Sequence, residues 1–178
     1  MVGRPNQDER RMMKSLALLA TALTLSAGAA QAEDIPTLPE AKAQVVTCLG
    51  AMDQDGGTTW NQCMEMLFAP CADREVATQA HLDCLLKERD DWLIGVEREQ
   101  ERTAAAITPQ GQNDLRNIMS QWRGYVRNKC ATAASQNTGI KADVAQAGCE
   151  MSEMALVTDE LISCVAGRSL SPYCIPQE

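Results

Sequence analysis

Eight cysteines constrain the fold of this 178-residue chain more than any other feature. They are Cys48, Cys63, Cys71, Cys84, Cys130, Cys149, Cys164 and Cys174. In a chain destined for an oxidising compartment, an even number of cysteines indicates a set of disulfides. The rival interpretation is a metal site, but zinc sites use closely spaced ligand pairs. The chain has no C-x-x-C pair, and His81 is its only histidine. The spacing therefore favours disulfides, and we expect no metal, no cofactor and no C-x-x-C redox chemistry.

Residues 1–32 have the layout of a secretory signal peptide with an upstream extension. A basic start at Lys14 leads into an apolar stretch over 16–27, and small residues follow up to Ala32. A membrane-spanning helix is the alternative, but the apolar stretch falls short of the roughly 20 residues that a bilayer core needs. We therefore expect cleavage after Ala32, export to a bacterial periplasm or the outside of the cell, and no stable membrane anchor afterwards.

Charge narrows the choice of partners. The predicted mature chain, residues 33–178, contains 12 lysines and arginines against 22 acidic residues, a net charge of −10. A chain this acidic repels nucleic acid and anionic lipid, so we expect neither as a partner. It suits a basic partner, but the charge also has a simpler interpretation, because a net charge far from zero keeps any protein soluble.

Helical periodicity dominates the mature chain, and strand signals are scarce. Thr37 and Glu40 form a capping box that opens a first helix, which Gly56-Gly57 ends. A second capping box at Thr59 opens a short helix that Pro70 closes. Three longer helices follow, starting at Thr78, at Thr108-Pro109 and after Gly139. The sequence thus predicts an all-α fold in one domain over 33–178, a small disulfide-stapled bundle of antiparallel helical hairpins.

Neighbouring cysteines pair naturally across the predicted turns. In an antiparallel hairpin, facing residues lie equally far from the turn, and cysteines many turns apart on one helix cannot bond. Four pairs have their midpoints at predicted breaks: Cys48–Cys63, Cys71–Cys84, Cys130–Cys149 and Cys164–Cys174. This coincidence selects one of the 105 connectivities that eight cysteines permit. The Cys71–Cys84 pair further requires residues 72–77 to form a loop.

Part of the chain resembles a known family. The segment Gln121-Trp122, Tyr125 and Cys130 resembles the Q-x-W-x-x-Y…C segment of LprI-type lysozyme inhibitor proteins, and Trp122, Tyr125 and Cys130 keep its spacing. Cys71, Thr78-Gln79 and Cys84 resemble the opening of the same domain, and the resemblance covers about residues 71–162. Val126, Met154 and Val157 stand where the family often has polar or basic residues. The resemblance implies a periplasmic or surface helical domain that binds and blocks lysozyme.

Candidate partner-binding residues are acids on the third predicted helix and a tryptophan among them: Asp90, Asp91, Trp92, Glu97 and Glu101. We expect Trp92 to be partly exposed because charged residues surround it, whereas Trp122 and Tyr125 are expected in the core. Glu99 and the acids Glu150, Glu153, Asp159 and Glu160 are further exposed candidates. A solvated helix face is the alternative explanation for each of these acids.

No catalytic arrangement accompanies these acids. His81 is expected at the surface and has no serine, cysteine or aspartate arrangement suited to nucleophilic catalysis. The sequence therefore predicts that the chain is not an enzyme. The expected function is a periplasmic binding protein that inhibits lysozyme or a related, basic peptidoglycan-cleaving enzyme. The alternative is a structural or accessory cell-envelope protein that binds another periplasmic component without inhibiting it.

Overall fold

The computed structural model of the chain describes residues 38–52, 57–169, 171 and 174. The described residues form five α-helices, a short 3₁₀ helix and no strands, which confirms the predicted all-α class. The elements are α2 (Glu40–Met52), α3 (Trp60–Phe68), η1 (Ala69–Cys71), α4 (Gln79–Ala106), α5 (Pro109–Ala134) and α6 (Ile140–Val165). The predicted signal peptide and the Thr37 cap lie outside the described residues.

Threonine caps begin three of the helices where the sequence predicted them. At the start of α3, the Thr59 hydroxyl accepts from the Gln62 N–H while the Gln62 side chain accepts from the Thr59 N–H, completing a capping box. Thr78 caps α4, and Thr108 caps α5 with Pro109 at the first helical position. Each cap satisfies a backbone N–H that a helix start would otherwise leave without a partner, so the boundaries are fixed locally.

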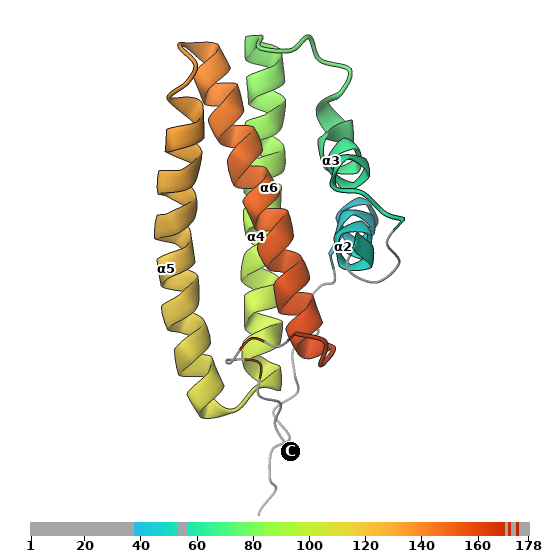
Figure 1. The fold of residues 1–178 in the computed structure, drawn as a ribbon, viewed down its shortest axis with the longest axis vertical. Helices are drawn as coiled ribbons and strands as arrows, with labels where there is room; N and C mark the ends of the chain where they lie inside the picture. Colours follow the sequence, from blue (N-terminus) through green and yellow to red (C-terminus); the bar gives the residue numbers. More distant parts are fainter. Residues whose placement is uncertain (1–37, 53–56, 170, 172–173, 175–178) are drawn as a thin grey trace, which may run out of the picture. The chain divides into compact units, whose positions relative to one another are not determined.

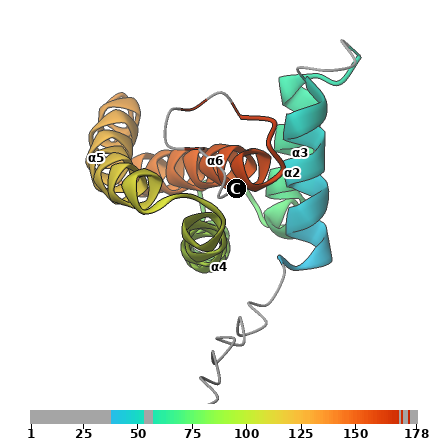
Figure 2. The ribbon, with the colours of Figure 1, turned by 90° about the horizontal axis from the view of Figure 1, so that it is seen from below.

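Helix α6 lies at the centre of the described arrangement (Figures 1 and 2). It packs most extensively against α4, and it also contacts α5 and α2. Helices α4, α5 and α6 alternate in direction, while α2 and α3 run across them as a separate hairpin (Figure 1). Gly139 and Gly167 flank α6 with φ angles of 57° and 68°, in the left-handed region that favours glycine. Helix α5 packs on one side of α6, and the α2–α3 hairpin lies on another, where α2 contacts α6 (Figure 2).

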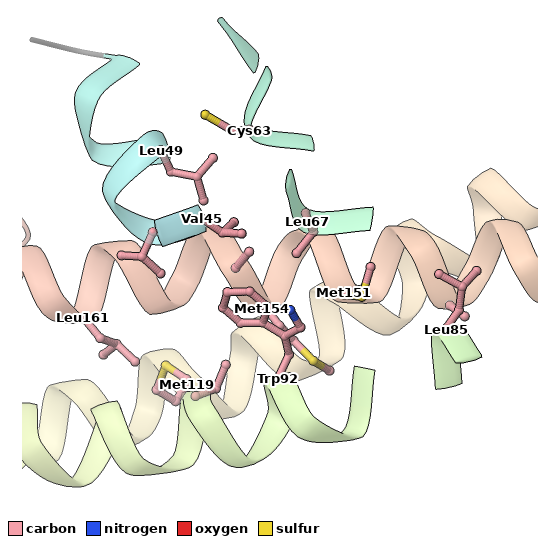
Figure 3. Packing of buried hydrophobic residues seen from close by; sticks show 14 of the residues in the cluster. Val45, Leu49, Cys63, Leu67, Leu85, Trp92, Met119, Met151, Met154 and Leu161 are labelled. Atoms are coloured by element: carbon pink, nitrogen blue, oxygen red, sulfur yellow. The ribbon is translucent and has the colours of Figure 1, made fainter. Parts of the chain in front are cut away.

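The core consists mainly of leucine, valine and methionine side chains grouped around a single buried tryptophan (Figure 3). Met151 and Leu161 of α6 and Met119 of α5 are buried in the same cluster as Trp92 of α4. Burying a side chain of this size stabilises the fold by about 1.5–3 kcal/mol. The Thr103 hydroxyl donates to the backbone oxygens of Glu99 and, at 3.2 Å, of Leu161, so it adds a buried hydrogen bond between α4 and α6.

Four disulfides join the same pairs that the sequence predicted, with Cα–Cα distances from 5.2 to 5.9 Å. Residues 72–78 form the non-helical connection that the Cys71–Cys84 pair requires, and Ala77 within it has a φ of 59°. Each bridge restricts the unfolded chain and contributes about 2–4 kcal/mol. Disulfides at this density are typical of extracellular or periplasmic proteins. Across the described residues, no helix is both long enough and apolar enough to cross a membrane.

Candidate functional site

The outward face of α4 carries acids spaced at seven, seven and four residues. These are Asp83, Asp90, Glu97 and Glu101, here called the acidic stripe, and all four are exposed. Residues at such spacings lie on one face of a helix. Ile94, 47% exposed, lies on the same face. The structure thus brings three of the five predicted binding residues, Asp90, Glu97 and Glu101, onto one exposed surface.

The charges along this face differ in how far they are compensated. Asp90 accepts from the guanidinium of its neighbour Arg89 at 2.7 Å, whereas Glu97 and Glu101 form no ion pair with any described residue. Partial burial alone would lower the pKa of Arg89, but the hydrogen bond to Asp90 and the nearby Glu150 outweigh it and raise that pKa. Asp83 also forms no ion pair with a described residue, so the uncompensated negative charge lies at both ends of the stripe.

Asp91 belongs to a different environment from Asp90. It is half-buried, and it accepts from the Lys87 ammonium at 2.7 Å one helical turn away. This hydrogen bond, with the charges of Lys87 and Lys42, holds the pKa of Asp91 below its ordinary value of 3.8, and Asp91 in turn raises the pKa of Lys87. Asp91 is therefore a partner for lysines of its own chain.

The prediction of a partly exposed Trp92 is wrong. Trp92 is 1% exposed and lies between α4 and α6 in the centre of the core (Figure 3). The Lys42 ammonium of α2 lies 5.0 Å from the centroid of its ring and 2.9 Å from a Glu88 carboxylate oxygen. The spacing of Leu85, Trp92 and Val96 by seven and four residues places Trp92 on the buried face of α4. The charges beside it in the sequence point elsewhere on the helix.

Several acids that were predicted at the surface instead form ion pairs within the chain. Glu99 is buried and accepts from Arg102 at 3.1 Å. Glu150 pairs with Arg89 of α4 at 3.4 Å, and Glu153 pairs with Lys129 of α5 at 2.7 Å, so these two carboxylates join neighbouring helices.

The last two acids of the set lie near the end of α6. Glu160 accepts from the Ser169 hydroxyl at 2.5 Å in the segment that follows α6. Asp159 lines a cavity of about 370 Å³ between α2 and α6, together with Val46, Ile162 and Arg168. Neither Asp159 nor Glu160 is fully exposed. Among the predicted partner-binding acids, the exposed ones therefore lie on α4, and the four on α6 are half-buried.

The aromatic residues of α5 are also placed differently from the prediction. Tyr125 is 56% exposed instead of buried, and the Lys129 ammonium lies 5.6 Å from its ring centroid. Trp122 is half-buried against the core, as expected for a residue beside the apolar stripe. Tyr125 precedes the buried Val126 by one residue, which rotates it by about 100° away from the buried face. In the α2–α3 hairpin, Trp60 is the exposed tryptophan.

Sequence reasoning also missed a basic feature of α5. Arg116, Arg123 and Arg127, here called the basic stripe, are exposed at spacings of seven and four residues. None of the three forms an ion pair within the part of the chain that the structure describes. The spacing of the three arginines is visible in the sequence, but the net negative charge of the chain does not reveal a basic face on one helix.

His81 has a structural role at the start of α4. Its Nδ1 accepts from the Ala77 N–H at 3.3 Å and so braces the loop that the Cys71–Cys84 disulfide closes. The residue is half-buried, not fully at the surface as predicted. No group of three or more potential metal ligands lies together among the described side chains.

Comparison with protein-family models, with curated proteins and with solved structures finds no match for this chain. The resemblance to LprI-type proteins therefore stays a prediction from its motif residues. In the structure, the motif residues do not form one cluster: Cys130 bonds to Cys149, Trp122 packs against the core, and Tyr125 faces solvent.

Proposed function

We propose that this chain is a periplasmic binding protein that inhibits lysozyme or a related basic peptidoglycan-cleaving enzyme, and that it is not itself an enzyme. The observation that carries the proposal is the acidic stripe of α4, an exposed and partly uncompensated row of carboxylates on a scaffold that four disulfides stabilise. The motif residues that resemble LprI-type inhibitors point to lysozyme as the target. In this proposal the predicted signal peptide is cleaved after Ala32, and the mature chain reaches the compartment where such enzymes act.

Electrostatic complementarity explains how the acidic stripe works in this proposal. Opposite charges steer two proteins together and raise the association rate, while pairs at the rim of an interface add less to the final affinity. Asp83, Glu97 and Glu101 contribute most, because no described basic side chain forms an ion pair with them. A rigid scaffold reduces the ordering cost of binding. Binding is therefore expected to be fast and to weaken as salt is added.

A lysis assay tests the proposal directly. The oxidised mature chain is added in increasing excess to a basic lysozyme acting on a suspension of cell walls, and the fall in turbidity is followed. The proposal expects lysis to slow with dose. Undiminished lysis at a large excess of folded protein would contradict it and leave the alternative, an accessory envelope protein without inhibitory activity.

Matched charge variants locate the contact. Replacing Asp90, Glu97 and Glu101 by Asn, Gln and Gln is expected to lower the association rate constant about tenfold at low salt. The control removes three exposed acids elsewhere, with the substitutions Glu65→Gln, Asp73→Asn and Glu75→Gln. Both variants change the net charge equally, so an equal loss in the two would show that overall charge, and not the acidic stripe, attracts the enzyme.

A further inference from the structure

The exposed face of α5 has no partner within the described part of the chain. Helix α5 packs on α6 and contacts α4 only slightly. Its exposed face carries the basic stripe, whose arginines form no ion pair with any described residue. Three guanidinium groups in one row, without compensating acids, form a surface that is complementary to a row of carboxylates at the same spacing.

Packing within the chain does not explain why a glycine, Gly124, lies on this face of α5. Gly124 lies in the interior of α5, where glycine destabilises a helix relative to alanine. A Cβ atom added there would meet no atom within 4 Å, so nothing in the chain itself requires its absence. Ser120, one turn earlier, is also small and exposed. Small side chains at such positions allow a second helix to approach closely.

The acidic stripe of α4 matches the basic stripe in spacing. The last three acids of the acidic stripe are separated by seven and four residues, as are the three arginines. With a rise of 1.5 Å per residue, both rows place their charges at about 0, 10.5 and 16.5 Å along the helix axis. If the two helices lie parallel, the pairs at one level are Asp90 with Arg116, Glu97 with Arg123 and Glu101 with Arg127.

Within one chain this pairing is impossible, because α4 and α5 run in opposite directions (Figure 1). A two-fold axis perpendicular to both helices reverses each of them, so α4 of one copy becomes parallel to α5 of the other. We propose that two copies of this chain associate about such an axis, with the acidic stripe of each copy against the basic stripe of the other. The interface is then self-complementary, as in most symmetric dimers. In this dimer the exposed Ile94 of one copy lies level with Ser120 of the other, and α5 of that other copy covers it beside Gly124.

A second copy fits this face better than other anionic partners because it offers carboxylates at the spacing of the three arginines. The mature chain has a net charge of −10, which repels any anionic partner at long range, a second copy included. At about 0.1 M salt, charges further apart than about 10 Å are largely screened, while contacting pairs act at much shorter range. The dimer goes beyond the proposed function, although it covers the acidic stripe and so competes with a basic enzyme for it.

Complementary charge reversal tests the dimer. Variant A carries Asp90→Arg, Glu97→Arg and Glu101→Arg; variant B carries Arg116→Glu, Arg123→Glu and Arg127→Glu. At about 0.1 M salt, light scattering should give the native mature chain twice the mass of one copy and each variant alone the mass of one copy. Their equimolar mixture should form a heterodimer, because every stripe then meets the opposite charge. A native chain that stays monomeric, variants that remain dimeric, or a mixture of folded variants that stays monomeric would each overturn the proposal.

A substitution that leaves the charge unchanged tests whether α4 of the second copy closely approaches α5 at Gly124. Gly124→Gln is expected to abolish the dimer while the melting temperature of the chain does not fall, since glutamine favours helix more than glycine does. Tyr125→Ala, on the same helix outside the stripe, should leave the dimer intact. A dimer that survives Gly124→Gln, or is lost with Tyr125→Ala, contradicts the assigned face. Gly124→Gln retains every acid of the acidic stripe and leaves the net charge unchanged, so its binding to lysozyme tests the proposed function separately.

Discussion

The α2–α3 and α5–α6 hairpins are each closed by one disulfide, yet they contain very different amounts of helix. Helices α2 and α3 have 13 and 9 residues, while α5 and α6 have 26 each. The short hairpin is joined to α4 by Lys42, which pairs with Glu88 and lies over the Trp92 ring. The long hairpin packs through an apolar stripe, and its Lys129–Glu153 pair is more exposed. Short helices are marginal alone. The short hairpin therefore depends on its anchors, and the long one on its packing.

The largest effect is expected from the tryptophan beneath the short hairpin. Trp92→Ala removes a fully buried ring from the core and should cost about 3–5 kcal/mol in free energy of unfolding. Trp60→Ala, at the exposed start of α3, should cost less than about 1 kcal/mol. Denaturant unfolding of the oxidised protein measures both. Equal losses would show that the hairpin's own tryptophan is as important as its anchor on α4.

Removing one disulfide from each hairpin separates covalent closure from packing. Each double variant, Cys48→Ala with Cys63→Ala or Cys130→Ala with Cys149→Ala, should lose about 3 kcal/mol of global stability. Hydrogen exchange should distinguish them. Without Cys48–Cys63, amides of α2 and α3 are expected to exchange much faster, because helices this short are marginal on their own. Without Cys130–Cys149, α5 and α6 should keep most of their protection. Similar local exchange in both variants would contradict the comparison.

The two ion pairs should differ in the same direction. Glu88→Gln leaves the buried Lys42 ammonium without its carboxylate and is expected to cost about 2 kcal/mol, below the range for fully buried pairs because some solvent reaches it. Glu153→Gln removes the partner of Lys129 in the long hairpin and should cost at most about 1 kcal/mol. Urea denaturation of both single variants gives the difference. A larger loss at Glu153 would reverse the proposed order.

Much of this fold could be predicted because the signals are local. A threonine cap such as Thr59 or Thr78 acts within one helical turn, and a disulfide across a turn depends only on equal distances from it. The prediction for Trp92 is wrong because it assumes that Trp92 shares the surroundings of its sequence neighbours, Asp90 and Asp91. On a helix, residues four and seven apart share a face, and adjacent residues do not.

The candidate site was harder to predict because exposure depends on which helices pack together. Nothing local distinguishes Glu153, which α5 covers in part and Lys129 neutralises, from Glu97, which faces solvent. The distinction arises from the packing of the helices. Helix α6 is central, so α4 and α5 cover its sides, whereas one face of α4 packs against no other described helix and stays exposed. The basic stripe was missed for a different reason: net charge averages over the chain, while binding depends on the charge of one face.

The smallest expected effect concerns pH and reports on the same anchor. Because the pKa of Asp91 is lowered in the folded chain, first by its hydrogen bond to Lys87 and in part by Lys42, its stabilising contribution is present above the ordinary value of 3.8. The contribution is lost as the pH falls through the folded pKa. NMR titration of the Asp91 carboxyl should show a pKa below 3.8 in the native protein and a higher one in Lys42→Met and in Lys87→Met. A pKa that Lys42→Met leaves unchanged would show that α2 contributes nothing to the field at Asp91, and that Lys42 acts only on Glu88 and Trp92.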